Sequence, residues 1–414
     1  MSAEDKTAGT TRREFLTATV ATGLALGIPT APASAVGANA SLRVGTIGSG
    51  GRCRELLRGA KYVPDLQVVT VCDVWDNAIR ETLGLLGQEH TGRDTKTTKE
   101  YREVLDDKSV DAVIIATPDH WHVPLLVEAL DAGKDVYVEK PLCHSLDEGE
   151  VALAAARKHK DRVVQVGQQQ RSMPHMIKCY EEIIKPGTLG KVFHARLWWN
   201  YWAYPNRPWQ VQVDPKTVDW TRWLGNQPYR DFNAYRFRGW RSFWGSGGGH
   251  TADLATHLID VVHWFLGLSH PAVASSAGGL YFSEDGRETP DTIHTLWTYP
   301  DKLVVTWEGN QSNGADGAGI EFHGTNGTLY IDRQLYEWKP SNGEPVVHHD
   351  GDLPRGHFNV RPDQDGEHLK DWINCVRDRK TPRVPIEVGV NAAGASNLSN
   401  LAYKSGAEVR WPEV

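Results

Sequence analysis

The sequence predicts an α/β amino-terminal domain with a parallel sheet, followed by an α+β domain with a large open, mainly antiparallel sheet. Two patterns support this prediction. Up to about residue 165, short apolar runs alternate with helical patterns, which is typical of parallel strands joined by helices. From Lys191 onward the chain shows long runs of alternating polarity, which is typical of an antiparallel sheet.

Length and composition narrow the class of protein. A chain of 414 residues exceeds one ordinary hydrophobic core, so two domains are expected. The net charge of −7 gives no basic surface, so a nucleic-acid partner is not expected. Five scattered cysteines lack metal-ligand spacing and argue against a disulfide framework.

The first 35 residues look like an export signal. The run Thr11-Arg12-Arg13-Glu14-Phe15-Leu16 precedes an uncharged apolar stretch, and Ala33-Ser34-Ala35 offers small residues for cleavage. This pattern resembles a twin-arginine (Tat) signal peptide at 1–35. It predicts export to the periplasm or the extracellular space, with the Tat translocase as a transient partner. The apolar stretch is short for a bilayer span, so the mature form is expected to carry no membrane anchor.

A glycine turn follows the first predicted strand. The strand 42–47 ends in Gly48-Ser49-Gly50-Gly51-Arg52-Cys53, and a helical stretch begins near Glu55. Gly48 permits a tight turn, and Gly50 lets the backbone approach a pyrophosphate at the helix N-terminus. Cys53 stands where such fingerprints carry Gly or Ala. The turn predicts a bound dinucleotide.

The next predicted strands end in polar side chains. The strand 68–73 ends in Asp73, whose carboxylate suits the ribose hydroxyls and disfavours a 2′-phosphate, so NAD is preferred over NADP; the alternative is a helix-capping Asp. A third strand is predicted at 111–116 and a fourth at 135–138. They end in the runs Thr117-Pro118-Asp119-His120-Trp121-His122 and Glu139-Lys140-Pro141.

These motifs together resemble the glucose–fructose oxidoreductase / inositol dehydrogenase (Gfo/Idh/MocA) family. The resemblance extends to Gly247-Gly248-Gly249 with Asp253 and His257, and it covers essentially all of the mature chain. It implies a Rossmann domain at 36–165, a substrate and oligomerisation domain at 166–365, and helices at 366–414 that return to the first domain. It also implies an NAD(P)-dependent oxidoreductase that acts on a secondary hydroxyl or keto group of a sugar, sugar derivative or glycoside.

The resemblance also implies site residues. Lys140 would touch the substrate hydroxyl and the nicotinamide region, Asp253 would orient substrate or tune the base, and His257 would be the general base. The alternative for Lys140 is a surface ion pair with Glu139. The expected cofactor-binding residues are Gly48, Ser49, Gly50, Gly51, Arg52, Asp73, Thr117, Pro118, His122, Glu139, Lys140 and Gln168.

A helical pattern at 251–264 carries polar residues on one predicted face. His250, Asp253 and His257 are spaced i, i+3 and i+7, beside an apolar face. His250 is a candidate substrate contact; the alternatives are a locally satisfied histidine or, with Asp253 and His257, a metal ligand. No metal is predicted, because hydride transfer needs none.

The second half predicts strands at 192–199, 273–282, 293–299, 303–310, 319–323 and 328–338, with a tight hairpin at Thr325-Asn326-Gly327. The open sheet predicts a homodimer or homotetramer.

Between the first two strands, an insertion rich in Trp and Arg suits a polyhydroxylated ring. Arg236 and Trp240 there, and Arg171 after the run 163–167, are candidate substrate contacts. The alternatives are a loop docked on its own domain or on a neighbouring subunit and, for Gln168 and Arg171, a solvated turn.

Export adds a constraint on the cofactor. Free NAD is scarce outside the cytoplasm, so a tightly held NAD is expected. A redox-neutral glycoside hydrolase that works through a transient keto-sugar is the alternative activity; the branch with that activity replaces the lysine of Glu-Lys-Pro, which this chain keeps as Lys140. A non-catalytic ligand-binding relative is the second alternative.

Overall fold

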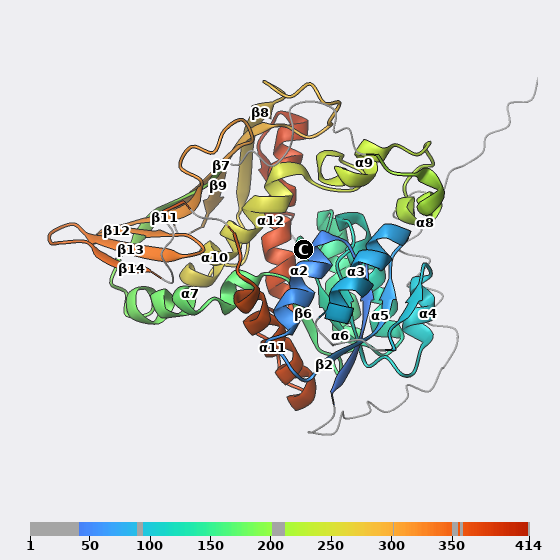
Figure 1. Ribbon diagram of the computed structural model, residues 1–414. Coiled ribbons are helices and arrows are strands. Elements are labelled where there is room, and N and C mark those ends of the chain that lie inside the picture. The colour runs from blue at the N-terminus through green and yellow to red at the C-terminus, as the bar shows by residue number, and fades with distance from the viewer. Residues whose placement is uncertain are drawn as a thin grey trace, which may run out of the picture.

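The computed structural model describes residues 41–88, 94–200, 212–300, 302–349, 355–356 and 359–412. The predicted signal peptide at 1–35 and part of the aromatic insertion lie outside the described residues. The predicted fold class is confirmed: one sheet is parallel, and the second is mixed and mainly antiparallel. Figure 1 shows the two sheets on opposite sides of the long helix α12.

The first domain is a six-stranded parallel sheet with helices between its strands. The strand order is β3-β2-β1-β4-β5-β6, so the connections change direction between β1 and β4. Ligands of such sheets bind at that switch point, at the carboxyl ends of the strands. The strands are β1 Leu42–Ile47, β2 Leu66–Cys72, β3 Lys96–Thr98, β4 Ala112–Ile115, β5 Asp135–Val138 and β6 Val164–Val166; the helices are α2 Gly51–Ala60, α3 Asp76–Gln88, α4 Tyr101–Asp106, α5 His122–Asp131 and α6 Leu146–Lys158.

The edge strand β3 was not predicted from the sequence, so the predicted third and fourth strands are β4 and β5. The four residues of β4 are apolar and buried, and the four of β5 are buried with Asp135 paired to Arg379. In contrast, β3 is the polar tripeptide Lys96–Thr98 at the sheet edge. A strand that is held by backbone pairing alone leaves no hydrophobic signal in the sequence.

The second domain is a nine-stranded sheet of order β14-β13-β12-β11-β7-β10-β9-β8-β15. Its only parallel neighbours among the described strands are β7 and β10. Along β10, buried residues alternate with partly exposed ones, so one face packs on the core. The strands are β7 Val192–Asn200, β8 Val273–Gly279, β9 Thr292–Tyr299, β10 Leu303–Asn310, β11 Ala318–Gly324, β12 Gly327–Ile331, β13 Leu335–Pro340, β14 Val346–His349 and β15 Val409–Arg410.

The single strand predicted at 328–338 was wrong: two strands, β12 and β13, meet at a tight turn. The turn is closed by the Asp332 carboxylate, which accepts hydrogen bonds from the backbone N–H groups of Gln334 at 2.8 Å and Leu335 at 2.9 Å. Arg333 lies in this turn. The predicted hairpin between β11 and β12 is confirmed, with Gly324 paired to Gly327.

Helices at the end of the chain connect the two domains. The helix α11 packs on α2, where a Cβ on Gly59 would lie 2.8 Å from the backbone nitrogen of Gly366, so the two helices approach very closely. The helix α12 contacts α6 on one side and both α10 and β8 on the other. The remaining helices are α7 Pro174–Cys179, α8 Trp220–Leu224, α9 Ala234–Arg238, α10 Thr256–Leu266, α11 Pro362–Asp378 and α12 Ile386–Ser405.

Two further expectations concern the described residues. All five cysteines are buried and free, as their spacing predicted. Within the part of the chain that the structure describes, no helix is long and apolar enough to cross a bilayer.

Arg171 joins the segment after β6 to α10 by a buried ion pair. Its Nε lies 2.9 Å and 3.0 Å from the two carboxylate oxygens of Asp260, which has no exposed surface. Arg171 does not line the ligand cavity described below. Its predicted substrate contact is therefore replaced by a structural role.

We expect Arg171→Ala to lower the free energy of unfolding by about 3–5 kcal/mol, because it leaves the buried Asp260 carboxylate without a counter-charge. Urea unfolding of the purified protein measures this loss. The matched control is the apolar pair Arg171→Met with Asp260→Leu, which removes both charges and should recover most of the stability. A loss below about 1 kcal/mol in the single variant would contradict the structural role.

Candidate active site

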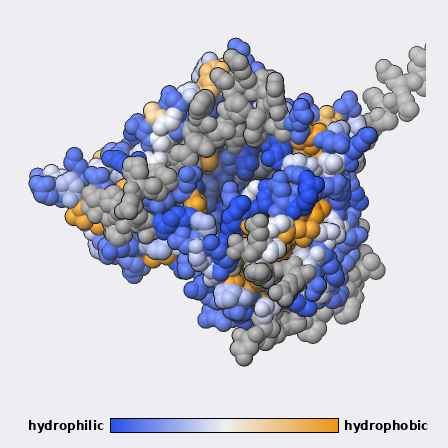
Figure 2. All heavy atoms as spheres, viewed as in Figure 1, coloured by the Kyte–Doolittle hydropathy of each residue, from blue (hydrophilic) through white to orange (hydrophobic). Residues whose placement is uncertain are grey.

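A cavity of about 890 Å³ opens at the carboxyl ends of the parallel strands. Its wall combines residues of β1 and β2, and residues that follow β4 and β5, with residues from the second domain, including Trp199, Asp253, His257 and Arg333. Figure 2 shows a hollow between the two lobes with mainly hydrophilic residues around it. Cavities of a few hundred to about 1,000 Å³ are typical of small-molecule and cofactor sites.

The glycine turn lies on this cavity wall. Gly48 has a φ of +81°, and a Cβ there would meet the backbone nitrogen of Thr117 at 2.7 Å, so only glycine fits. Gly50 and Gly51 face open space at the N-terminus of α2, where backbone N–H groups are available to a pyrophosphate. Cys53 is fully buried, and burial raises the pKa of its thiol to about 12, so it is a packing residue.

Asp73 is fixed by two backbone amides. Its carboxylate accepts hydrogen bonds from Ser49 N–H at 2.7 Å and from Trp75 N–H at 2.9 Å. Burial raises the pKa of Asp73 to about 6, against the lowering effect of these two bonds. Each carboxylate oxygen keeps a lone pair, so the group can still accept hydrogen bonds from a ribose. The side chain of Ser49 is buried beneath the turn and bonds to the Cys72 carbonyl, so Ser49 does not line the cavity.

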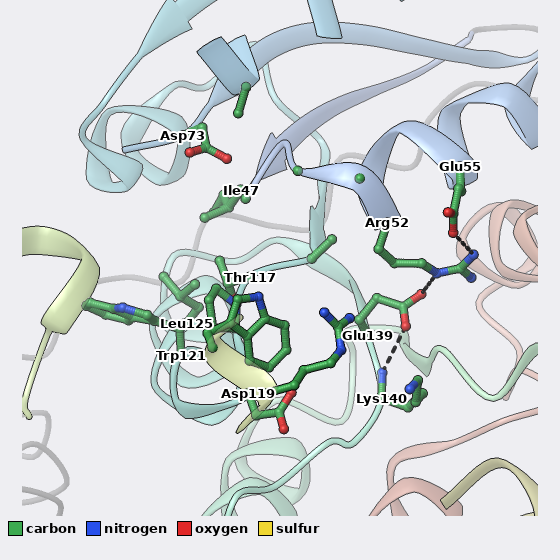
Figure 3. Close-up of a pocket in the computed structure, with 18 of the residues that line it drawn as sticks. Ile47, Arg52, Glu55, Asp73, Thr117, Asp119, Trp121, Leu125, Glu139 and Lys140 are labelled. Carbon is green, nitrogen blue, oxygen red and sulfur yellow. Dashed lines mark hydrogen bonds and ion pairs between the residues drawn. The ribbon is translucent and has the colours of Figure 1, made fainter. Parts of the chain in front are cut away.

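Arg52 connects three segments of the cavity wall by hydrogen bonds. Its Nε donates to Glu139 at 2.8 Å, and its two terminal nitrogens donate to Asp365 at 2.9 and 3.0 Å. Figure 3 shows Arg52 between Glu55 and Glu139, with the backbone nitrogen of Lys140 bonded to Glu139. Arg52 therefore ties α2 to the end of β5 and to α11.

Lys140 meets Asp253 across the domain boundary. The Nζ of Lys140 lies 2.9 Å from Asp253 Oδ1 and also donates to the Asp253 backbone carbonyl. Arg241 Nε lies 3.0 Å from the same carboxylate oxygen. Burial would raise the pKa of Asp253, but the charges of Arg241 and Lys140 outweigh burial and hold the pKa well below its usual range. The alternative expectation, an ion pair between Lys140 and Glu139, does not occur.

His257 is buried on the cavity wall. Burial, followed by the positive charges of Lys140 and Arg333, lowers its pKa well below the usual value. Its imidazole is therefore neutral near pH 7 and able to accept a proton. Its ring packs against Trp199, with centroids 6.4 Å apart.

The cavity brings together most of the predicted residues. Those that line it are Gly48, Gly50, Gly51, Arg52, Asp73, Thr117, Pro118, Glu139, Lys140, Trp240, Asp253 and His257.

Several other predicted residues have structural partners instead. The ring nitrogens of His122 lie 2.9 Å from the Thr117 carbonyl and 2.7 Å from the Pro141 carbonyl, so His122 holds two cavity loops in place. Arg236 pairs with Glu288 at 2.5 Å and lies over the Phe243 ring. Gln168 is buried and does not line the cavity.

His250 is also displaced from the cavity. Its Nε2 lies 3.0 Å from the Trp199 carbonyl, and burial lowers its pKa to about 4. The reason is local: residues Thr251–Ala255 form a π-helical turn before α10 begins. A π turn needs more residues than an α turn, so the i, i+3, i+7 spacing does not keep His250 on the face of His257.

The sequence analysis missed Asp119, Arg241 and Arg333, which all line the cavity. Asp119 follows Thr117-Pro118 at the end of β4, and that position was its only sequence signal. Arg333 was hidden in the unrecognised β12–β13 turn; its Nε donates to Gln170 at 3.0 Å, and its guanidinium lies over Trp199. Among the described residues, no group of acids, histidines or cysteines has the arrangement of a metal site.

A glycine turn, an acid after the second strand and an inter-domain lysine on one cavity are the features of a two-domain dinucleotide-binding oxidoreductase. Residues 42–168 match the Gfo/Idh/MocA description "Oxidoreductase family, NAD-binding Rossmann fold", and residues 181–411 match its "C-terminal alpha/beta domain". The chain belongs to this family.

Individual relatives are more distant. A glycosyl hydrolase family 109 protein of Shewanella pealeana is 26% identical over 236 residues, which cover 53% of this chain and 49% of that protein. Levoglucosan dehydrogenase of Pseudarthrobacter phenanthrenivorans is 29% identical over 175 residues, covering 41% of this chain and 37% of that enzyme. The chain thus spans half or less of the length of these curated relatives.

Solved structures share the fold over nearly the whole chain. Levoglucosan dehydrogenase in complex with NADH and levoglucosan has a TM-score of 0.68 at 18% identity, covering 90% of this chain and 100% of that one. Myo-inositol 2-dehydrogenase from Lactobacillus plantarum has a TM-score of 0.66 at 20% identity, covering 89% and 99%.

Asp119 gives a test of the cavity electrostatics. Burial, opposed by the charge of Arg241, raises the pKa of Asp119 to about 8. The native state then holds a proton that the unfolded chain releases at about pH 4, so stability falls as pH rises from about 4 to about 8. Asp119→Asn removes this proton linkage. We expect its melting temperature to fall less than that of the parent between about pH 5 and pH 8, measured without added cofactor. If the melting temperatures of the two proteins change with pH in the same way, that result would contradict a raised pKa of Asp119.

Proposed function

We propose that this protein is an NAD-dependent oxidoreductase that interconverts a secondary hydroxyl and a keto group on a sugar, sugar derivative or glycoside. The observation that carries the proposal is the convergence of Lys140, Asp253 and His257 on the cavity that also holds the glycine turn. A proton acceptor, a fixed cation and a dinucleotide site on one wall are what hydride transfer from an alcohol requires.

Each residue of the site has a separate role in the proposed reaction. NAD, when bound, supplies the hydride acceptor at its nicotinamide ring. The imidazole of His257 is neutral because burial and neighbouring cations lower its pKa, and it lies on the cavity wall as the acceptor for the hydroxyl proton. Lys140 stabilises negative charge that develops on the oxygen, and Asp253 holds the Lys140 ammonium in place. Trp240 is partly exposed on the cavity wall and offers an apolar ring for the C–H edges of a sugar. Trp199 is buried and supports Arg333 and His257.

The similarity to the glycosyl hydrolase family 109 protein favours a second candidate, redox-neutral glycoside hydrolysis through a transient keto-sugar. In that reaction the cofactor is reduced and reoxidised within one turnover. Release of the aglycone without net NADH supports this alternative, whereas net NADH with an intact glycosidic bond supports the dehydrogenase.

We further propose that the protein is exported by its twin-arginine signal, that it holds its NAD tightly, and that it assembles as a homodimer or homotetramer through the open sheet. The support is the Arg12-Arg13 motif with its cleavage site, and the partly exposed face of β10 in the second sheet. Extraction of cofactor from purified protein, followed by a panel of sugars and glycosides including levoglucosan and myo-inositol, tests the substrate class.

We expect Lys140→Met and His257→Gln to retain NAD but to lower kcat by about 10²- to 10³-fold, because each removes one group from the hydroxyl without altering the glycine turn. NADH formation measures turnover, and cofactor content of the purified variant is the control. Full activity in both variants would rule out the proposed site.

We expect Asp73→Ala to weaken NAD binding by about 10- to 100-fold, because a ribose loses a charged hydrogen-bond acceptor. Discrimination against NADP should also decrease, because a carboxylate no longer repels the 2′-phosphate. Equilibrium titration with NADH and NADPH measures both effects. Asp73→Asn is the matched control, since it keeps the shape of the side chain that anchors Ser49 and Trp75. If both variants keep the same preference for NADH over NADPH, Asp73 does not contact the ribose.

A further inference from the structure

A segment of the second domain packs on the first domain beside the cofactor cavity. We call residues 212–246 the clasp; it contains α8 and α9 and lies between β7 and α10 along the chain. Figure 1 shows α8 next to α3 and α4 of the first domain. The clasp therefore reaches away from its own sheet.

Backbone pairing anchors the clasp close to Asp73. Val218 forms an antiparallel bridge with Trp75, and the Asp219 N–H donates to the Val74 carbonyl at 2.8 Å. Trp75 follows Asp73 by two residues and directly precedes α3. The clasp is thus hydrogen-bonded to the loop that carries the ribose-binding acid.

A second anchor lies at the end of β4. The Trp223 carbonyl accepts a hydrogen bond from Trp121 Nε1 at 3.0 Å and lies 2.9 Å from His120 Nε2. Gly225 has a φ of +59°, and a Cβ there would lie 2.5 Å from the Trp121 ring. The close approach of the clasp to this loop requires glycine at position 225.

An aromatic cluster fills the space between the two anchors. Trp220 and Trp223 stack with centroids 4.6 Å apart, and Phe237 packs edge-on against Trp75 at 5.5 Å. Arg238 places its guanidinium over the Trp75 ring at 4.8 Å. Aromatic area of this kind supplies most of the adhesion between the clasp and the first domain.

The ion pairs at the clasp edge contribute little by comparison. Arg222 lies 3.1 Å from Glu100, but its side chain is 47% exposed, and exposed pairs contribute about 0–1 kcal/mol. Lys99 donates to the Thr217 carbonyl at 3.3 Å and pairs with Asp76 at 2.7 Å. The attachment is therefore the aromatic cluster of Trp220, Trp223 and Phe237 against Trp75, with two backbone contacts and a weak polar rim.

The clasp and the first domain line the same end of the cavity. Trp223, Phe237 and Arg238 line it from the clasp, and Asp73 and Trp75 line it from the first domain. Phe237 and Arg238 both contact the Trp75 ring, so the clasp and this loop form one continuous wall. Because a carboxylate at the end of the second strand marks the adenosine ribose, the cavity beyond Asp73 is the adenine end. Aromatic faces and a flat cation suit a purine ring.

We propose that the clasp is the outer wall of the adenosine subsite, and that its attachment to the first domain slows release of the dinucleotide. This inference rests on the proposed function, since it requires NAD in this cavity. It assigns an adenine-nucleotide contact to residues of the second domain, in addition to those of the glycine turn.

A reversible cross-link tests the proposal. Partners in an antiparallel bridge have Cα atoms about 4.5–5.5 Å apart, which matches disulfide geometry, so Trp75→Cys with Val218→Cys can lock the clasp. The five native cysteines are buried and do not compete. The full chain is loaded with NADH and oxidised, and NADH release is followed by fluorescence during a chase with excess NAD. We expect release at least tenfold slower in the oxidised form than after reduction of the same sample.

The comparison of one variant in two redox states removes the effect of the lost Trp75 ring. Equal release rates in the two redox states, with the cross-link verified by mass spectrometry, would overturn the proposed role of the clasp. The proposed function would not be affected by that result. Failure of the parent protein to bind NADH at all would overturn both. A second variant keeps the test decisive if the double cysteine variant does not fold. Gly225→Ala should speed NADH release at least tenfold through its clash with Trp121, and an unchanged rate there also overturns the clasp.

Discussion

The contact between Lys140 and Asp253 is the interaction on which the candidate site depends. Lys140 follows the last residues of β5 in the first domain, whereas Asp253 lies in the π-helical turn of the second. Neither charge is stable alone in so buried a place, so each domain supplies what the other needs. Arg241 adds a second cation to the same carboxylate. The carboxylate therefore stays ionised, and the lysine is held at a fixed point beside His257.

Much of this arrangement could be predicted from the sequence. Residues that end buried strands, such as Asp73 and Lys140, must lie at one edge of a parallel sheet, because strand direction fixes where they project. Gly48 was recognisable because the turn requires its backbone freedom, and Gly50 because it directly precedes the helix α2. The fold class followed from the change of hydrophobic period near Lys191.

The positions of other residues could not be predicted from the pattern of the sequence. His250 was misplaced because a π turn interrupts the α-helical period, and nothing in Thr251–Ala255 announces that interruption. Arg333 was missed because β12 and β13 read as one alternating run, although the Asp332 carboxylate closes a turn between them. Arg171 and Arg236 resemble substrate-binding arginines in the sequence, yet each has a carboxylate partner that only the tertiary structure reveals. A charged side chain in a loop does not indicate whether its counter-ion belongs to the protein or to a ligand.

The helix α12 limits how such a protein can admit its ligands. Thirteen of its residues are buried, and its small side chains, including Ala392, Gly394 and Ser396, allow close contact on opposite sides. One side packs on α6 and β6 of the parallel sheet, and the other packs on α10 and β8 of the second sheet. A rotation between the domains has to break one of these two buried contacts, so α12 disfavours a hinge opening of the two lobes. Ligands would then enter and leave through movements of small peripheral segments. Single substitutions in such a segment could change the rate of ligand exchange without changing the relative position of the two domains.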